Sequence, residues 1–133
     1  MPTITGAHHL ALTVTDVQRS AAWYADLLGM VPVFDGADDS VTFRVFAHPG
    51  CGWVIGLREY AAGSGDPFEE MRTGLDHFAF GVASIADLHE WETELDRRGI
   101  TYTPAVATPI GTVVVFRDPD QIQLEFWLPS GST

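Results

Sequence analysis

The sequence contains no lysine, and its seven basic residues are all arginine. This absence excludes enzymes that form a Schiff base through lysine and nucleotide-binding proteins that use a P-loop lysine. Eighteen acidic residues give the 133-residue chain a formal net charge of -11. Because nucleic acids and anionic membranes attract positively charged proteins, we expect neither as a partner. A cationic ligand, or solubility alone, fits this charge better.

Cysteine and long apolar runs are also scarce. Cys51 is the only cysteine, so the chain cannot form an internal disulfide. No apolar run has the length of a membrane span, and residues 1–9 lack the basic and apolar regions of a signal peptide. We therefore expect a cytoplasmic protein. With 46% hydrophobic and 19% charged residues, the chain can bury a core as one domain covering residues 1–133.

An internal repeat organises the sequence. Segments 9–14 and 77–82, His-Leu-Ala-Leu-Thr-Val and His-Phe-Ala-Phe-Gly-Val, align and alternate in polarity or size as strands do. Each is followed by apolar residues at helical spacing, over 17–28 and over 85–95, after a capping Asp or Ser. Both predicted helices end at a glycine, Gly29 or Gly99, as helices commonly do.

Three strand-like segments follow each predicted helix. They cover residues 30–34, 40–46 and 53–58 in the first half, and 101–103, 112–117 and 122–127 in the second. The sequence thus predicts an α+β fold of two βαβββ modules, about residues 5–60 and 75–128, joined by a glycine-rich linker over 61–74. One such module is too small to be stable alone, so we expect the two to pack together or to exchange with a second chain.

Strand alternation places three potential metal ligands on polar faces. His9 and His77 lie on the faces opposite the large apolar residues of their strands, and Glu125 shares a face with Gln123 and Trp127. A carboxylate within an apolar strand needs a partner or a metal. Two histidines and one carboxylate typically bind one divalent ion, here Fe, Mn, Zn or Ni, and leave positions open for substrate or water.

Further candidates for a substrate pocket come from the same reasoning. His48 lies beside a Pro-Gly turn, where it is a candidate acid or base. Gln123 is two residues from Glu125, and Trp127 is a candidate for stacking on a substrate. The acidic pair 69–70 is expected to be a solvated face. Taken singly, each histidine is more often structural, so the metal hypothesis depends on the repeat and on the carboxylate together.

Four motifs resemble the vicinal oxygen chelate superfamily. They are His-x-x-x-x-Val-x-Asp from residue 9, Ser-x-x-Trp-Tyr-x-x-Leu-Leu-Gly-Met from residue 20, Asp-His-x-Ala-Phe-x-Val from residue 76, and Asp-Pro-Asp-x-x-x-x-Glu from residue 118. This superfamily includes glyoxalase I, methylmalonyl-CoA epimerase, extradiol dioxygenases, fosfomycin-resistance transferases and bleomycin-resistance proteins. The resemblance implies paired βαβββ modules whose curved, mixed sheet forms a cup with the helices outside.

The resemblance also implies a ligand set. The superfamily's metal positions fall on His9, His77 and Glu125, and a fourth position, usually Glu or Gln in glyoxalase I and the epimerases, falls on Gly56. Glu59 has the opposite strand parity from Gly56 and does not replace it. The remaining three-ligand arrangement is similar to the dioxygenase and fosfomycin-transferase branches, although the latter use a lysine.

Three functions remain open from the sequence. The first is a small metal-dependent enzyme, dioxygenase-like or related, acting on a small molecule with two adjacent oxygens. The second is a non-catalytic protein, similar to bleomycin-resistance proteins, that sequesters a cationic or aromatic ligand. The third is a lyase or isomerase of the glyoxalase or epimerase type. In each case we expect a homodimer.

Overall fold

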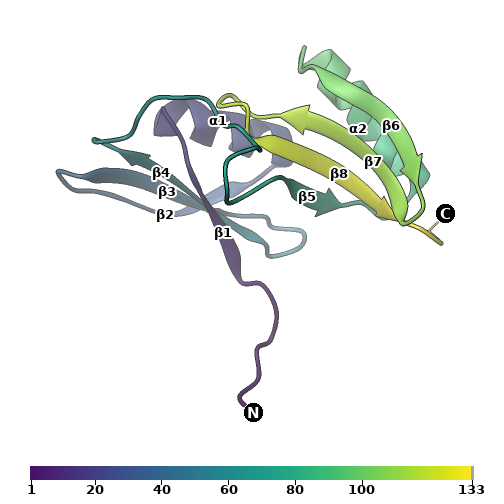
Figure 1. Cartoon of the computed structure of the whole chain (residues 1–133), viewed down its shortest axis with the longest axis horizontal. Helices are drawn as coiled ribbons and strands as arrows, with labels where there is room; N and C mark the ends of the chain where they lie inside the picture. The colour runs from purple at the N-terminus through teal and green to yellow at the C-terminus, as the bar shows by residue number, and fades with distance from the viewer. Residues whose placement is uncertain (133) are drawn as a thin grey trace. The chain divides into compact units, whose positions relative to one another are not determined.

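The computed structural model describes residues 1–132 and divides into two compact units, with the boundary between Asp66 and Pro67 (Figure 1). The boundary falls inside the predicted linker over 61–74. Each unit has the order strand, helix, three strands, so the predicted α+β fold with two βαβββ repeats is confirmed. Neither described helix is long and apolar enough to cross a membrane.

The two units have the same sheet topology. In unit 1 the order is β1-β4-β3-β2, and in unit 2 it is β5-β8-β7-β6. The first strand of each unit pairs in parallel with the last, and the other pairs are antiparallel. The elements of unit 1 are β1 His9–Thr13, α1 Val17–Leu28, β2 Val31–Ala37, β3 Val41–Ala47 and β4 Val54–Tyr60. Those of unit 2 are β5 Phe78–Gly81, α2 Ile85–Arg97, β6 Tyr102–Thr108, β7 Gly111–Arg117 and β8 Gln123–Pro129.

The helices begin at the predicted residues, and each ends before its predicted glycine, α1 at Leu28 and α2 at Arg97. The Asp16 side chain accepts a hydrogen bond from the Arg19 amide at 3.0 Å, and Ser84 accepts one from the Asp87 amide at 3.1 Å. These side chains satisfy amides that the first helical turn leaves without a partner. After the helices, Gly29 and Gly99 adopt φ values of 64° and 66°, a left-handed conformation that glycine enters without steric cost.

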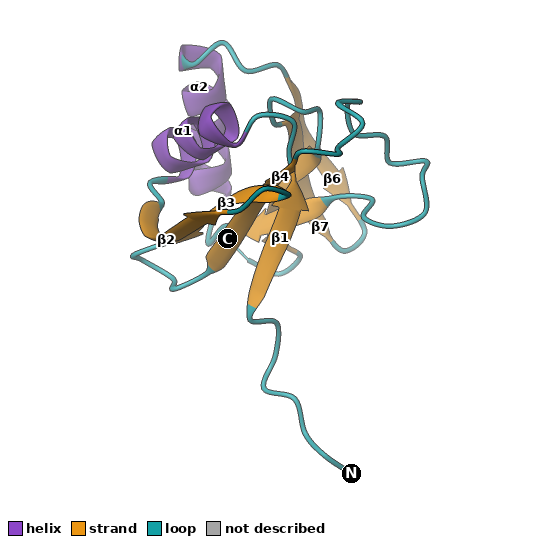
Figure 2. Ribbon diagram, turned by 90° about the vertical axis from the view of Figure 1, so that its left-hand side faces the viewer, coloured by secondary structure: helices purple, strands orange, loops and turns teal. Residues whose placement is uncertain are grey.

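Each helix packs on its own sheet, α1 over β3 and β4 (Figure 2), and α2 over β6 and β8. On β8 the even-numbered residues are buried and the odd-numbered ones are only partly covered, as the alternation predicts. In unit 2, Trp91 of α2 stacks on Phe126 with ring centroids 4.2 Å apart. The opposite face of each sheet therefore carries the polar side chains of the candidate site. The most deeply buried core residues include Tyr24, Ile55 and Leu57 in unit 1, and Leu88, Leu95, Val114, Phe116 and Leu124 in unit 2.

The edge strands β2 and β6 are longer than predicted. Each contains a proline near its start, Pro32 or Pro104, and a register shift beside it. Proline cannot donate a ladder hydrogen bond, so it is tolerated at edges and bulges. In β6 the amide of Ala105 leaves the ladder and donates to Glu92 of α2 at 2.7 Å. The prediction of a three-residue strand over 101–103 was wrong because pairing with β7 resumes after this bulge.

Candidate functional site

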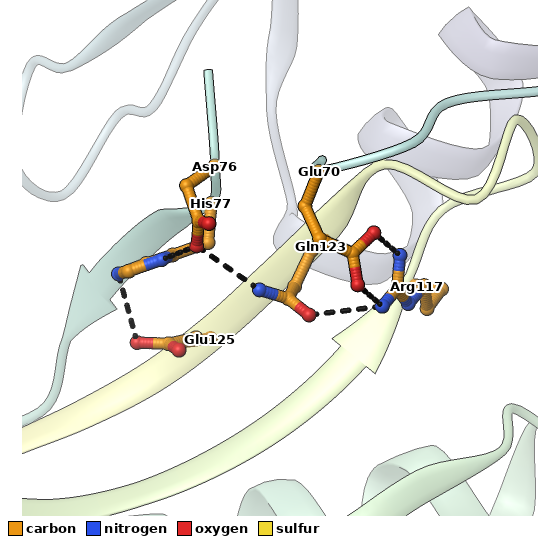
Figure 3. Close-up of polar contacts among 6 residues, drawn as sticks. All are labelled: Glu70, Asp76, His77, Arg117, Gln123 and Glu125. Atoms are coloured by element: carbon orange, nitrogen blue, oxygen red, sulfur yellow. Dashed lines mark hydrogen bonds and ion pairs between the residues drawn. The ribbon is translucent and has the colours of Figure 1, made fainter. Parts of the chain in front are cut away.

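A histidine and a carboxylate face each other on the polar side of the unit 2 sheet (Figure 3). His77 immediately precedes β5, and Glu125 lies on the neighbouring strand β8, opposite Ala79 in the parallel register. His77 Nε2 lies 3.6 Å from Glu125 Oε2. The Glu125 side chain is 12% exposed and that of His77 is 44% exposed. The pair is therefore open on the histidine side, while the carboxylate is largely covered.

The other ring nitrogen of His77 contacts Asp76. Its Nδ1 lies 2.6 Å from Asp76 Oδ1. An ionised carboxylate only accepts hydrogen bonds, so in the neutral ring the proton is on Nδ1. The lone pair of Nε2 then points towards Glu125, and two electron-pair donors face each other. This donor set suits a cation, since both imidazole nitrogen and carboxylate oxygen bind divalent transition metals.

Three further polar side chains extend this contact along the sheet. Arg117 of β7 forms a two-pronged ion pair with Glu70, at 2.9 and 3.1 Å, and also donates to the Gln123 side chain at 2.9 Å. The Gln123 amide nitrogen in turn lies 3.4 Å from Asp76 Oδ1. The hydrogen bond from Arg117 lowers the pKa of Glu70 to about 2, and the same pair raises the pKa of Arg117.

The interpretation of residues 69–70 as a merely solvated face was wrong for Glu70. Its partner Arg117 is 47 positions away in the sequence, and no local pattern connects them. Glu69 does fit that interpretation, because its partner is Arg72, three residues further on and 66% exposed.

His9 belongs to unit 1 and is the first residue of β1. It is exposed, pairs with Val54 in the register, and its Nδ1 lies 2.8 Å from Nδ1 of His8. Two positions further along, Ala11 pairs with Gly56, just as Ala79 pairs with Glu125 in unit 2. The register therefore makes Gly56 the counterpart of Glu125 in the repeat, as the sequence comparison predicts.

Gly56 leaves unit 1 without the corresponding carboxylate. A Cβ atom built on Gly56 would meet the Ala11 Cβ at 3.5 Å, an ordinary contact, so the missing side chain is not required by close packing. Glu59, the nearby acid on β4, forms a hydrogen bond with the start of α1. Its Oε2 accepts the amide of Val17 at the start of α1, at 2.8 Å. Glu59 thus serves the helix terminus, in agreement with its predicted strand parity.

The remaining pocket candidates have local partners. His48 Nδ1 faces the amides of Gly50 and Cys51 at 3.1 and 3.2 Å, which orders the turn between β3 and β4. Trp127 leans towards Gly111, where a Cβ atom would come within 2.7 Å of the indole ring. Its ring therefore packs along β7, towards the end of the sheet distant from Arg117. Their roles in a substrate pocket stay predictions.

The metal hypothesis stays a prediction, and the contacts within unit 2 concern only two of its three residues. Among residues 1–132, no group of three or more His, Cys, Asp or Glu side chains is placed to hold a metal ion. The two donors that do face each other are separated by 3.6 Å. Two ligands about 2.1 Å from one ion lie about 3 to 3.4 Å apart, so a small side-chain adjustment brings His77 and Glu125 to that spacing. The residues present fit a divalent cation in their chemistry.

Comparison with known proteins agrees with this architecture. The family model for the Glyoxalase/Bleomycin resistance protein/Dioxygenase superfamily matches residues 6–126. A crystal structure of a glyoxylase/bleomycin resistance protein/dioxygenase domain from Frankia sp. EAN1pec is 38% identical, with a TM-score of 0.88, over 96% of this chain and 99% of that one. The uncharacterized protein YwkD of Bacillus subtilis is 28% identical over 127 residues, which is 90% of this chain and 94% of that protein.

A more distant likeness concerns the fold alone. The fosfomycin resistance protein FosX from Listeria monocytogenes is 20% identical, with a TM-score of 0.76, over 97% of this chain and 94% of that one. A mutant of that protein has been crystallised with Mn(II) and 1S,2S-dihydroxypropylphosphonic acid.

The paired βαβββ units and the polar sheet face define a protein of the vicinal oxygen chelate class. More specifically, the chain belongs to the Glyoxalase/Bleomycin resistance protein/Dioxygenase superfamily. This superfamily includes metal-dependent enzymes as well as binding proteins. Membership therefore defines the fold, and the function has to be inferred from the residues of the site.

Proposed function

We propose that the protein is a small metal-dependent enzyme whose divalent cation, Fe, Mn, Zn or Ni, is held by His9, His77 and Glu125. The observation that carries this proposal is the facing pair of His77 and Glu125, with Asp76 on the other ring nitrogen. That arrangement keeps the imidazole in the form that binds a metal. His9 completes the set from unit 1, either of the same chain or of a second copy in a homodimer.

The substrate proposed for this site is a small molecule with two adjacent oxygen atoms. A bound ion would supply Lewis-acid chemistry to a substrate oxygen, and a redox-active ion such as iron would also allow reaction with dioxygen. Glu125 is the single anionic ligand, so a divalent ion keeps a net positive charge that favours an anionic substrate oxygen. Asp76 accepts a hydrogen bond from Nδ1 of His77, which leaves Nε2 of the ring for the ion.

The glycine at position 56 favours dioxygenase-like chemistry over the glyoxalase or epimerase type. A proton shuttle of the latter type uses a carboxylate or amide at this place, and Gly56 has no side chain. Glu59 does not compensate, since its carboxylate accepts the Val17 amide. A site with three protein ligands leaves more positions for substrate and dioxygen, as in two-histidine, one-carboxylate iron sites.

Metal titration of the purified protein tests the proposal directly. We expect about one Mn(II), Fe(II), Zn(II) or Ni(II) ion per chain by calorimetry, and at least 100-fold weaker binding in each of His9→Ala, His77→Ala and Glu125→Gln. The matched control is His89→Ala, because the His89 side chain is exposed on α2 and its one described hydrogen bond is to Glu92. Wild-type protein that takes up none of these ions would contradict the proposal.

A binding protein without catalysis is the second candidate, and an aromatic surface in unit 1 favours it. Phe34 of β2 is 64% exposed and lies 5.7 Å from the ring of Phe43. Arg58 already lies over Phe43, at 5.2 Å from the ring centroid, so this surface suits a flat aromatic ligand better than a cation. Binding of an aromatic ligand that is unchanged by Glu125→Gln but lost in Phe34→Ala would favour this alternative.

A cytoplasmic location and a homodimer complete the proposal. A single cysteine and an acidic surface suit the cytoplasm, and a homodimer is the proposed assembly. Light scattering after size-exclusion chromatography tests the latter, with an expected mass about twice the 14.5 kDa of the chain. A mass equal to that of a single chain at micromolar concentration would contradict it.

A further inference from the structure

A continuous run of polar contacts leads from Glu70 to His77 (Figure 3). Glu70 binds Arg117, Arg117 binds Gln123, Gln123 contacts Asp76, and Asp76 binds His77. The five side chains come from three places: the segment before β5, the end of β7 and the start of β8. None of the first four residues touches Glu125 through the contacts described. The run therefore reaches His77 at Nδ1, the ring nitrogen that does not face Glu125.

The hydrogen bonds in this run have a fixed direction. Arg117 has only donors, so it must face the side-chain oxygen of Gln123. The amide NH2 group of Gln123 then points to Asp76 Oδ1, and the same oxygen accepts from Nδ1 of His77. Reversing the Gln123 amide would place its NH2 group against the guanidinium. The charge of Arg117 thus determines which end of Gln123 reaches Asp76.

Both terminal nitrogens of Arg117 form hydrogen bonds within the protein. Both terminal nitrogens contact the Glu70 carboxylate, and Nη1 also donates to the carbonyl oxygen of Gln121 at 3.0 Å. Gln121 has a φ of 67°, an unusual conformation for a residue other than glycine, in the turn between β7 and β8. Arg117 therefore fixes both the turn and the Glu70 segment, and its charge is neutralised within the protein rather than offered to a substrate anion.

Asp76 needs such support because it is exposed. Its side chain is 65% exposed, and a solvent-exposed pair of polar side chains holds a geometry only weakly. The segment that carries it is fixed at two other points. The Phe68 amide donates to the Asp120 carbonyl oxygen at 2.8 Å, and Glu70 binds Arg117. These contacts hold residues 68–77 against β7 and β8 and so keep Asp76 beside the His77 ring.

We propose that Asp76 and the Glu70–Arg117–Gln123 group are positioning residues that hold His77 in the Nδ1-protonated form and present Nε2 to the ligand-binding face. The metal-binding consequence depends on the function proposed above, whereas the effect on the histidine ring is a property of the protein without metal. Hydrogen-bond partners on the distal nitrogen of a ligating histidine commonly contribute 10- to 100-fold to metal affinity, which sets the expected magnitude.

Nitrogen NMR of the histidine rings in metal-free protein tests the positioning. At about pH 8, we expect wild-type His77 to show a protonated Nδ1 and an unprotonated Nε2. Asp76→Ala should shift the ring towards a mixture of the two neutral forms. Glu70→Gln and Gln123→Leu should do so partially. Glu69→Gln is the matched control, since Glu69 lies in the same segment but binds the exposed Arg72.

Metal affinity gives the second readout. In calorimetric titrations with Zn(II), Asp76→Ala should bind about 10- to 100-fold more weakly than wild type, and Glu69→Gln should bind equally well. Circular dichroism confirms that each variant is folded, and Gln123→Leu replaces Glu70→Gln if the latter unfolds. An unchanged His77 ring form in folded Asp76→Ala would overturn the inference. A wild-type protein with the expected ring form but no metal binding would overturn the proposed function and leave the positioning intact.

Discussion

Position 56 shows how one side chain distinguishes the two halves of the repeat. Gly56 and Glu125 occupy equivalent places on β4 and β8, each beside an alanine of the parallel neighbour strand. Glu125 gives unit 2 a carboxylate, and Gly56 gives unit 1 only backbone. A divalent ion held by His9, His77 and Glu125 would therefore have one anionic ligand. This asymmetry separates a three-ligand site from the four-ligand site that the superfamily resemblance implies for glyoxalase I.

Substitution of Gly56 by glutamate tests whether this position faces the metal. A Cβ atom fits there without a close contact, but the position is buried, so an unpaired carboxylate should destabilise the metal-free protein by about 1 to 3 kcal/mol. Added Zn(II) or Mn(II) should reverse the loss and raise Tm above that of the wild type with metal. Gly56→Ala is the control and should show no such metal dependence. Equal metal effects on the two variants would count against the assignment.

The ion pair of Glu70 and Arg117 predicts a pH-dependent contribution to stability. Folding lowers the pKa of Glu70 to about 2 from a usual value of 4.5, so the pair stabilises the native state above about pH 4.5 and ceases to do so as the pH falls towards 2. Urea unfolding should therefore show Glu70→Gln to be less stable than wild type at pH 7. The difference should shrink between pH 4.5 and 2. A difference that is constant over this range would show that another interaction is responsible.

Elements of the fold are joined by a few specific polar contacts. The first turn of α1 receives two of them, one from Asp16 and one from Glu59 of β4. The second contact links the helix to the centre of its own sheet, since β4 lies between β1 and β3. It also explains why Glu59 is unavailable for metal binding.

Removal of the Glu59 carboxylate should affect stability and leave the metal site intact. Glu59→Ala takes away a partner of the Val17 amide, and loss of a helix-terminal acceptor costs about 0.5 to 2 kcal/mol. Chemical denaturation measures this loss, with Glu90→Ala on the exposed face of α2 as the control. Metal affinity should equal that of the wild type. A large fall in affinity would indicate that Glu59 reaches the ion after all.

The packing of β7 against β8 is equally specific at Gly111. A methyl group there would overlap the Leu128 carbonyl oxygen and the Trp127 ring, so Gly111→Ala should cost about 1 to 3 kcal/mol. Gly81→Ala on β5 is a matched control, since a Cβ atom at that residue meets nothing within 4 Å. Thermal unfolding compares the two. Similar Tm values for both variants would contradict the close packing of Trp127 on Gly111.

At the scale of the whole molecule, the proposed function requires both units. Unit 2 provides two of the three proposed ligands and the positioning residues, whereas unit 1 provides only His9. If the ion needs all three ligands, His9→Ala and His77→Ala should weaken metal binding to a similar extent. Unchanged affinity in His9→Ala would restrict the site to unit 2. Calorimetry on the two variants, side by side with wild type, makes this comparison.

Sequence patterns were sufficient for the order of the elements and for both helices, because these depend on local physics, whereas the edge strands β2 and β6 extend beyond their predicted ends. Alternation along His9–Val14 and its repeat, helical spacing, capping side chains and terminal glycines act within a few residues, and each is visible in the printed chain. The chemical types of His9, His77 and Glu125 are visible in the same way. Their strand faces follow from counting alternate positions, and the buried pattern of β8 agrees with that count.

Tertiary structure alone decided which side chains meet. Nothing local connects Glu70 with Arg117, or Gln123 with Asp76, because each pair is separated by 47 positions and is brought together only by the folding of unit 2. For the same reason the sequence could not predict which ring nitrogen of His77 donates to Asp76 and which faces Glu125, since this depends on the surrounding atoms. The repeat in the sequence determined the scaffold and the types of the candidate ligands. The fold determined that Asp76 contacts Nδ1 of His77 and that Glu125 lies near Nε2. The reason is that hydrogen bonds and charges act over a few ångströms of space and not along the chain.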